Sequence, residues 1–171
     1  MIHRVTRREP TRPFARASAR RGFTLPELVV VVLIMGILTA VAMPRWAATV
    51  QQSYVDNAAK RVVADLAKAQ SLAYAMSKSQ TVTFTVGANQ YTMDGQADPE
   101  HPSAVYTVRL DRSPYNASLV SVNLPGAQPV TFNGYGLPVG LPASGGTIVV
   151  AAGNLQRTIT IDAATGTAVV Q

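Results

Sequence analysis

The sequence predicts an α+β protein in which one long N-terminal helix, first transmembrane and then amphipathic, packs on an antiparallel β domain. A long apolar stretch without charge leads directly into a segment whose apolar residues recur at helical spacing. From Gln80 onward the pattern changes to short alternating segments, separated by turns rich in glycine and proline. The 171 residues suffice for one modest domain with an N-terminal tail.

Residues 1–22 form a basic leader. They carry seven of the fifteen basic side chains and one of the nine acids, which accounts for the whole net charge of +6. The seven are Arg4, Arg7, Arg8, Arg12, Arg16, Arg20 and Arg21. From Phe23 onward the charges balance, so the rest of the chain lacks the excess of cations that binds phosphate backbones. We therefore expect no nucleic-acid partner.

The next segment, residues 23–44, is predicted to be a transmembrane helix. Its stretch 28–43 has no charge and spans roughly 24 Å as a helix, and a start near Thr24 extends it toward the bilayer core of about 30 Å. Because the arginines precede the span, the leader is expected in the cytoplasm and residues 45–171 in the periplasm. Pro44 is expected to kink or end the helix.

Residues of about 46–78 are predicted to form an amphipathic helix that covers its own domain's sheet. Its apolar positions follow one another at steps of three and four residues. They are Val50, Tyr54 or Val55, Ala58, Val62, Leu66, Ala69, Ala73 and Met76. The opposite, polar face is assigned to Asp56, Lys60, Asp65 and Lys68.

The β domain is predicted over about residues 80–171, with 81–86 and 91–94 as a hairpin around a GANQ turn. Further strands are expected at 105–110, 118–122, 130–133, 147–151, 157–162 and 167–171. The stretch 134–146, rich in glycine and proline, is expected to be a loop.

The junction RRGFTLPE (20–27) combines residues with separate physical roles. The two arginines hold the leader at the cytoplasmic face, and Gly22 allows an extended backbone to enter a protease groove. Pro26 is tolerated in a first helical turn, and Glu27 lies where a helix N-terminus favours negative charge. In a bundle of such helices, Glu27 can pair with the new amino terminus of a neighbouring subunit.

These residues resemble the class III signal of type IV prepilins and type II secretion pseudopilins. The resemblance implies that prepilin peptidase cuts between Gly22 and Phe23, that Phe23 is then N-methylated, and that Glu27 guides filament assembly. Pro44 stands where many pilins have a helix-kinking proline. The implied partners are the peptidase, other pilins or pseudopilins through their N-terminal helices, an inner-membrane assembly platform and membrane lipid. The leader is long for this family, which leaves open whether Met1 is the true start.

The C-terminal stretches VTFNGYGLP (130–138), SGGTIVV (144–150) and AGNLQRTITIDAATG (152–166) resemble the β domain of GspH/FimT-like minor pilins. This resemblance implies a minor pseudopilin of a type II secretion system, anchored by one span in the bacterial inner membrane and built into a periplasmic filament. The alternative is a minor pilin of a type IV pilus, acting in motility, adhesion or DNA uptake. The tail 166–171 has no basic residue, which argues against DNA uptake.

An ordinary export signal is the rival interpretation. Residues 20–23 also match the core of a twin-arginine motif, and Ala40-Val41-Ala42 is an acceptable signal-peptidase site. The mature protein would then be a soluble periplasmic domain that starts at Met43. Against this, Glu27 lies at the start of the apolar region, which is longer than the usual region of about 7–15 residues.

No enzymatic site, cofactor or metal is predicted. The chain has no cysteine, and its two histidines, His3 and His101, are far apart, so no pairing of a nucleophile with a base is available. One loop gathers Asp94, Asp98, Glu100 and His101, and its carboxylates are oxygen ligands of the kind that calcium prefers. It lacks the spacing of a known calcium loop, so a solvated turn is the favoured interpretation.

Overall fold

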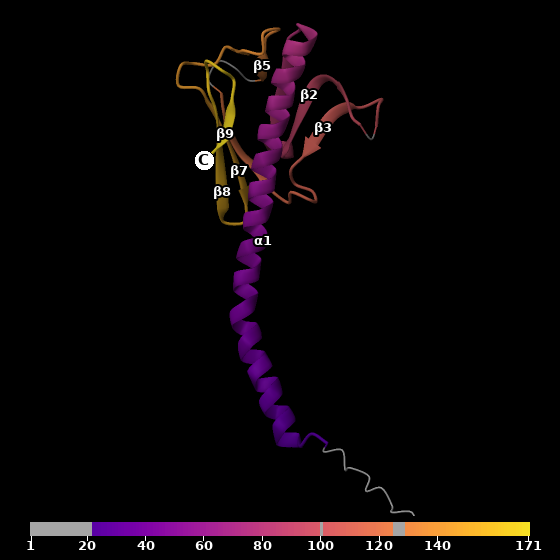
Figure 1. The fold of residues 1–171 in the computed structure, drawn as a ribbon, viewed down its shortest axis with the longest axis vertical. Coiled ribbons are helices and arrows are strands. Elements are labelled where there is room, and N and C mark those ends of the chain that lie inside the picture. Colours follow the sequence, from indigo (N-terminus) through magenta and orange to yellow (C-terminus); the bar gives the residue numbers. More distant parts are fainter. Residues whose placement is uncertain (1–21, 100, 125–128) are drawn as a thin grey trace, which may run out of the picture. The chain divides into compact units, whose positions relative to one another are not determined.

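The computed structural model describes residues 22–99, 101–124 and 129–171, and the leader prediction for 1–21 lies outside them. One helix, α1 (Leu25–Met76), precedes all the strands (Figure 1). The strands are β1 (Gln80–Thr85), β2 (Gln90–Ala97), β3 (Val105–Arg109), β4 (Ser118–Asn123), β5 (Val130–Phe132), β6 (Pro138–Val139), β7 (Gly146–Ala152), β8 (Leu155–Ile161) and β9 (Ala168–Val170), with a short 3₁₀ turn, η1 (Val86–Ala88), after β1. The α+β prediction is confirmed.

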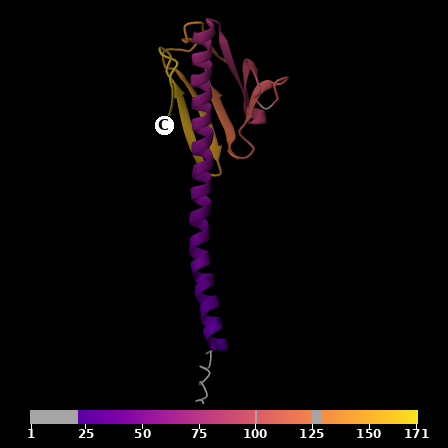
Figure 2. The same cartoon turned by 45° about the vertical axis from the view of Figure 1, so that its right-hand side comes forward.

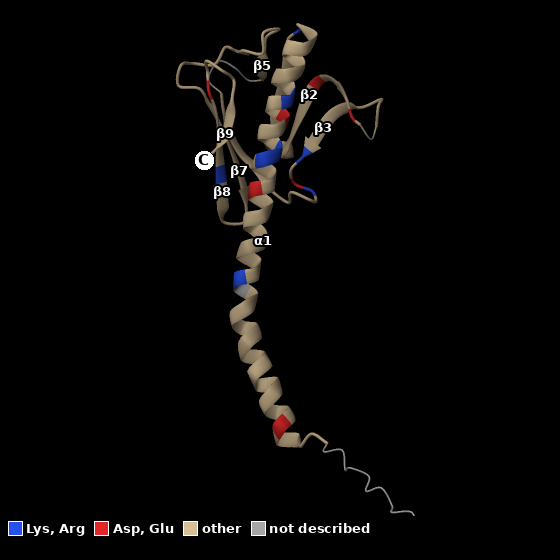
Figure 3. Ribbon diagram, in the orientation of Figure 1, with Lys and Arg blue, Asp and Glu red and all other residues tan. Residues whose placement is uncertain are grey.

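The chain divides into two compact units, of which the first ends at Val41. The described residues of this unit are helical from Leu25, and all of their side chains are exposed. Figure 3 shows a long stretch of α1 without a charged residue, which includes residues 28–43. By length and composition, α1 is able to cross a membrane.

α1 continues through position 44, so the predicted end of the helix at Pro44 is wrong. A proline inside a helix removes one backbone hydrogen bond but leaves the others available. Whether Pro44 kinks the helix stays a prediction. The helix ends instead at Met76, where Ser77 adopts a left-handed conformation with φ of 50°. The Lys78 N–H then donates to the Ala73 carbonyl, a Schellman arrangement that closes the last turn.

The second unit starts at Ala42, and within it α1 has the predicted apolar stripe. Its buried members are Val55, Ala58, Val62, Leu66, Ala69 and Ala73, and Ala59, which the prediction did not include, is buried beside them. Met76 was expected to continue it but is 52% exposed, because it is the last residue of the helix. Figures 1 and 2 show this half of α1 lying across both sheets.

Two antiparallel sheets form the β domain. One has the order β3-β2-β1-β5-β6, and the other has the order β4-β7-β8-β9. The predicted hairpin is confirmed, with Val82 opposite Met93 and Thr85 opposite Gln90. Asn89 in its turn has φ of 49°, a conformation that asparagine tolerates better than most residues. The predicted loop 134–146 holds one strand that periodicity could not reveal, since β6 is two residues long.

Small side chains on α1 face large side chains from both sheets in one core. The helix contributes four buried alanines, whereas the sheets contribute Tyr91, Phe132, Ile148 and Ile159. Alanine at these positions lets the sheets approach the helix closely, and the larger residues fill the space. The predicted packing of the amphipathic helix on its own sheets is therefore confirmed.

Polar contacts hold α1 at several heights along the domain. Closest to the N-terminal end of α1, the Nε of Arg157 on β8 lies 2.7 Å from a carboxylate oxygen of Asp56. Further toward the C-terminal end of α1, the Gln70 amide donates to the carbonyls of Gly136 and Thr165, at 2.8 and 2.6 Å. These bonds connect the helix to β8, to the loop before β6 and to the turn before β9.

Asp65 was assigned to the solvent-exposed face, and this assignment is wrong, because Asp65 is only 4% exposed. Its carboxylate accepts hydrogen bonds from the Tyr91 hydroxyl at 2.6 Å, from the Tyr106 hydroxyl at 3.0 Å and from the Arg61 Nε at 3.0 Å. A buried carboxylate is stable only when such donors replace water. Arg61 also donates to the Tyr106 hydroxyl, which completes a network between α1, β2 and β3.

The same network shifts the ionisation of its members. Burial raises the pKa of the Tyr91 and Tyr106 hydroxyls, and the neighbouring Asp65 carboxylate raises both further. For Arg61, partial burial lowers the pKa, but attraction to Asp65 and the tyrosines more than offsets this and raises it overall. At neutral pH the tyrosines are therefore fixed as donors and Arg61 as a cation.

We expect Asp65→Ala to destabilise the domain by about 3 kcal/mol, because two buried hydroxyls and one guanidinium lose their acceptor. The matched control is Asp56→Ala, which removes a carboxylate from the same helix. Asp56 and Arg157 are each about 30% exposed, so this change should cost less than about 1 kcal/mol. Urea unfolding of the two variants measures both values. Equal losses would contradict the assignment of Asp65 as the central acceptor.

Candidate functional site

The processing junction lies where the described chain begins. Residues 22–24 are not helical, and α1 starts at Leu25. Phe23 is 80% exposed, and a side chain added at Gly22 would meet no other atom within 4 Å. The Gly22–Phe23 peptide bond is therefore part of an open, non-helical segment directly before a helix. Such a bond is accessible to a protease, because the backbone needs no unfolding before it enters a groove.

Glu27 turns back onto the start of its own helix. The Thr24 N–H donates to the Glu27 Oε2 at 3.5 Å, while the Thr24 carbonyl accepts the first helical bond from Leu28 N–H at 3.1 Å. This is one half of a capping box, in which an acid in the first turn satisfies a free backbone donor. The bond is long and exposed, so Glu27 is free to exchange it for a stronger partner.

The three predicted residues of the junction lie together. Gly22, Phe23 and Glu27, with Thr24 between them, line one open hollow of about 520 Å³. The bond predicted to be cut, the residue predicted to be methylated and the carboxylate predicted to guide assembly therefore share one surface. Cleavage would create an α-amino group on Phe23, close in sequence to the Glu27 carboxylate.

The apolar part of α1 meets the requirements of a span. Its only described hydroxyl between Leu28 and Met43, that of Thr39, donates to the Met35 carbonyl at 2.7 Å. In hydrocarbon such internal bonds replace those with water. Glu27 is the one charged residue in the first turn, and the next charged residue along the helix is Arg45.

The described residues show no metal site of the kind considered in the sequence analysis. Across the described ranges, no three metal-binding side chains cluster closely enough to hold an ion. Asp98 and His101 belong to one turn, in which the His101 N–H donates to the Asp98 Oδ1 at 3.3 Å, and Glu100 lies outside the described residues. The sequence missed a second feature, the Asp65 network, because its two tyrosines come from distant strands. The only local signal was the Arg61–Asp65 spacing of four residues.

Comparison with known proteins places both parts of the chain. Residues 17–43 match the family model of the prokaryotic N-terminal methylation motif, and residues 58–165 match that of the type II transport protein GspH. No curated protein matches the chain.

Two solved structures are similar to this chain, and the first of them reaches a TM-score of 0.5. The minor pseudopilin EpsH from the type 2 secretion system of Vibrio cholerae has a TM-score of 0.50 at 14% identity, covering 68% of this chain and 95% of EpsH. The type IV minor pilin FimU of Pseudomonas aeruginosa has a TM-score of 0.49 at 15% identity, covering 70% and 88%. At 14% identity the likeness to EpsH speaks for the fold alone. The GspH model, by contrast, covers more than half of the sequence and includes most of the helix stripe and the strands. The chain therefore belongs to the GspH family of minor pseudopilins and minor pilins.

Proposed function

We propose that this protein is a minor pseudopilin of a type II secretion system, a structural subunit of a periplasmic pseudopilus that helps to export proteins. The match of residues 58–165 to the type II transport protein GspH carries this proposal. The match covers most of the buried face of α1 and most of the β domain. The prepilin motif at 17–43 supports the remaining assignments: processing by prepilin peptidase, membrane anchoring and assembly with other pilins.

In this role each segment has one task. The basic leader 1–22 would hold the precursor at the cytoplasmic face until prepilin peptidase removes it. Residues 23–44 would anchor the subunit in the inner membrane and later pack among the helices of neighbouring subunits. Residues 45–171 would stand in the periplasm as the folded, structural domain of the subunit.

Deletion of the gene separates this proposal from its alternative. In the host bacterium, loss of a minor pseudopilin should reduce the secretion of the type II substrates and leave pilus-driven surface motility intact. Secretion is measured in culture supernatants, and motility is measured on agar, with complementation by the full chain as the control. Normal secretion with lost motility, adhesion or DNA uptake would instead identify a minor pilin of a type IV pilus.

Processing at Gly22–Phe23 yields a sharp prediction for the purified membrane protein. We expect its first residue to be Phe23, and its intact mass to include one additional methyl group on the amino terminus. Gly22→Leu should accumulate as the precursor, because a branched side chain would obstruct the extended backbone in the protease groove. The control Gly36→Leu, in the middle of α1, should be processed normally. A chain beginning at Met43 would establish the export-signal interpretation.

Glu27 tests the assembly step. In a filament, the carboxylate would be enclosed among helices and would need a cation, which the Phe23 amino terminus of an adjacent subunit supplies after cleavage. Glu27→Gln removes the charge but retains an oxygen that can accept from Thr24 N–H, so the helix start should persist. We expect insertion and cleavage to be nearly unchanged, while recovery in sheared filaments falls.

The matched control for this experiment is Asp94→Asn, the same loss of charge at an exposed position of the β domain. It should enter filaments as the wild type does. Both variants are compared at equal cellular levels by co-purification with, or crosslinking to, the other filament subunits. Wild-type recovery of Glu27→Gln would show that this subunit assembles without the proposed pair.

A further inference from the structure

A groove runs along the free edge of β3. Its volume is about 520 Å³, and its lining includes four consecutive residues, 106–109. Successive side chains of a strand point to opposite faces of the sheet. A hollow that touches four in a row therefore follows the edge of the strand rather than one face. β3 is the outermost strand of its sheet, so in the described part of the chain no strand pairs with that edge.

The backbone groups of Thr107 and Arg109 face this open edge. The Leu110 N–H donates to the Asn89 carbonyl on the β2 side, and Val108 lies opposite Tyr91. In an antiparallel ladder the direction of the backbone groups alternates from residue to residue. The N–H and carbonyl groups of Thr107 and Arg109 therefore point away from β2. Such an edge is a template for another strand, and β3 contains no proline to block it.

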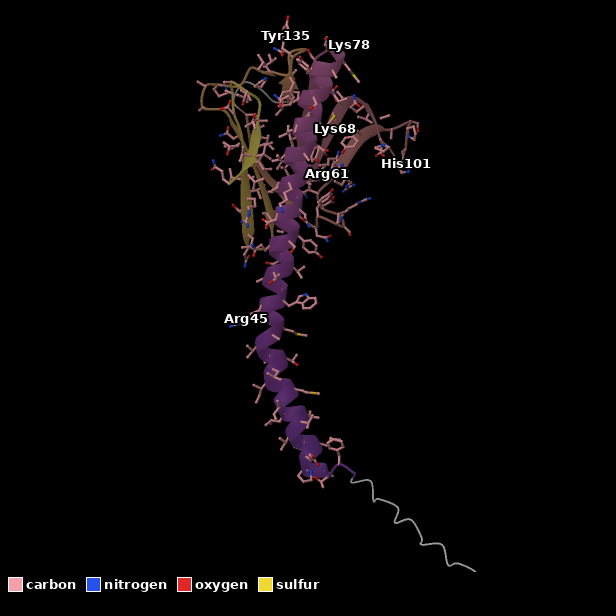
Figure 4. All side chains as sticks on the ribbon, viewed as in Figure 1. Arg45, Arg61, Lys68, Lys78, His101 and Tyr135 are labelled. Atoms are coloured by element: carbon pink, nitrogen blue, oxygen red, sulfur yellow. The ribbon has the colours of Figure 1, made fainter. Side chains whose placement is uncertain are left out.

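Cationic side chains surround the edge. Arg61 from α1, Arg109 from β3 and Arg112 from the following loop line the groove, while Asp98 is the carboxylate among its lining residues. Figure 4 labels Arg61 and His101, which contribute to the groove from α1 and from the loop before β3.

The arginines keep donors for a ligand. Arg61 uses its Nε and Nη2 for Asp65 and Tyr106, and Arg109 uses the corresponding atoms for Asp111. A guanidinium has five N–H donors, so each retains some for another acceptor. Among the described residues, the Arg112 side chain makes no ion pair or hydrogen bond, although its charge adds to that of Arg109 in lowering the pKa of the Asp111 carboxyl.

We propose that this groove binds an extended, acidic peptide segment of another protein, which joins the sheet as an additional strand beside β3. The alternating donors and acceptors of Thr107 and Arg109 match a peptide backbone in main-chain spacing and polarity. The arginines would bond to carboxylates of the segment, and a bidentate arginine–carboxylate pair gives both energy and orientation. A nucleic-acid phosphate would use the arginines but would leave the carbonyl groups of the edge without donors.

This assignment goes beyond the role of a filament subunit, because it gives the globular domain a binding site of its own. The site is separate from the helix-mediated contacts of the N-terminal segment. It would serve recognition of a partner whether the filament belongs to a secretion system or to a pilus.

The test uses the full chain in detergent and a fluorescein-labelled peptide that alternates valine with glutamate. Thr107→Pro removes the outward N–H without breaking a bond between β2 and β3. Arg112→Glu reverses the charge of the unpaired arginine. Each change should weaken binding, measured by fluorescence anisotropy, at least about tenfold, since a charge-assisted or edge hydrogen bond is lost.

Two matched controls lie away from the groove. Ala168→Pro places the same residue on the edge strand β9. The Thr167 carbonyl accepts from the Asp162 N–H, and the Gln171 N–H donates to the Thr158 carbonyl, so these two residues bond toward β8. Because the direction alternates along the strand, the Ala168 N–H points outward. Lys78→Glu reverses an exposed charge beyond the end of α1 (Figure 4). Neither should change the affinity for the peptide. A glutamine version of the peptide should bind at least about tenfold more weakly than the glutamate version.

Several results would overturn the proposal. These are absence of peptide binding, equal binding of the glutamate and glutamine peptides, or full binding by a folded Thr107→Pro variant. A thymidine oligonucleotide that displaces the peptide, and whose own binding depends on Arg112 but not on Thr107, would identify a phosphate site instead. If circular dichroism shows that Thr107→Pro does not fold, Arg112→Glu decides alone: it should prefer a lysine version of the peptide, and unchanged preference for glutamate would refute the groove.

Discussion

The close approach of α1 to both sheets is the constraint on which the rest of the globular domain depends. The helix offers alanines, namely Ala58, Ala59, Ala69 and Ala73, where most core helices offer larger side chains. The volume of the core must therefore come from the sheets, which supply Tyr91, Phe132 and the isoleucines of β7 and β8. Enlarging one of the alanines would push the sheet away, because such cores have little free space. This seam is what makes two small sheets and one helix a single packed unit.

Polar groups between α1 and the two sheets determine the position of the helix along the sheets. Asp65 holds the hydroxyls of Tyr91 and Tyr106, and it lies between the Asp56–Arg157 ion pair below and the Gln70 hydrogen bonds above. A shift of the helix by one turn would leave the buried carboxylate without donors, at a cost that hydrophobic contacts alone would not impose. Smooth alanine surfaces tolerate sliding, so the network supplies the register that small side chains cannot.

The same helix serves two environments with one secondary structure. Up to Val41 every described side chain is exposed, including a continuous series of large apolar residues, whereas from Val55 to Ala73 the apolar stripe is buried. An apolar helix whose side chains stay exposed among the described residues is suited to lipid or to packing against other helices. The first segment is thus the part of the chain suited to a membrane. The second segment is free to present surfaces of the β domain, among them the groove beside β3.

The sequence by itself determined the apolar span, the helix stripe and most of the strands, and it predicts the junction at Gly22–Phe23. These features are local: they depend on composition, on period and on residues adjacent in the chain. It could not place Asp65, which looked like one more charge on a solvated face, nor detect the two-residue β6. Tyr91 and Tyr106 reach Asp65 from 26 and 41 residues away in the chain. Arg61 on α1 and Arg112 in the loop after β3 both line the groove at the open edge of β3. Only the tertiary structure decided these arrangements, because burial and strand order arise from contacts between distant segments. The local pattern of one segment does not show which other segment it will contact.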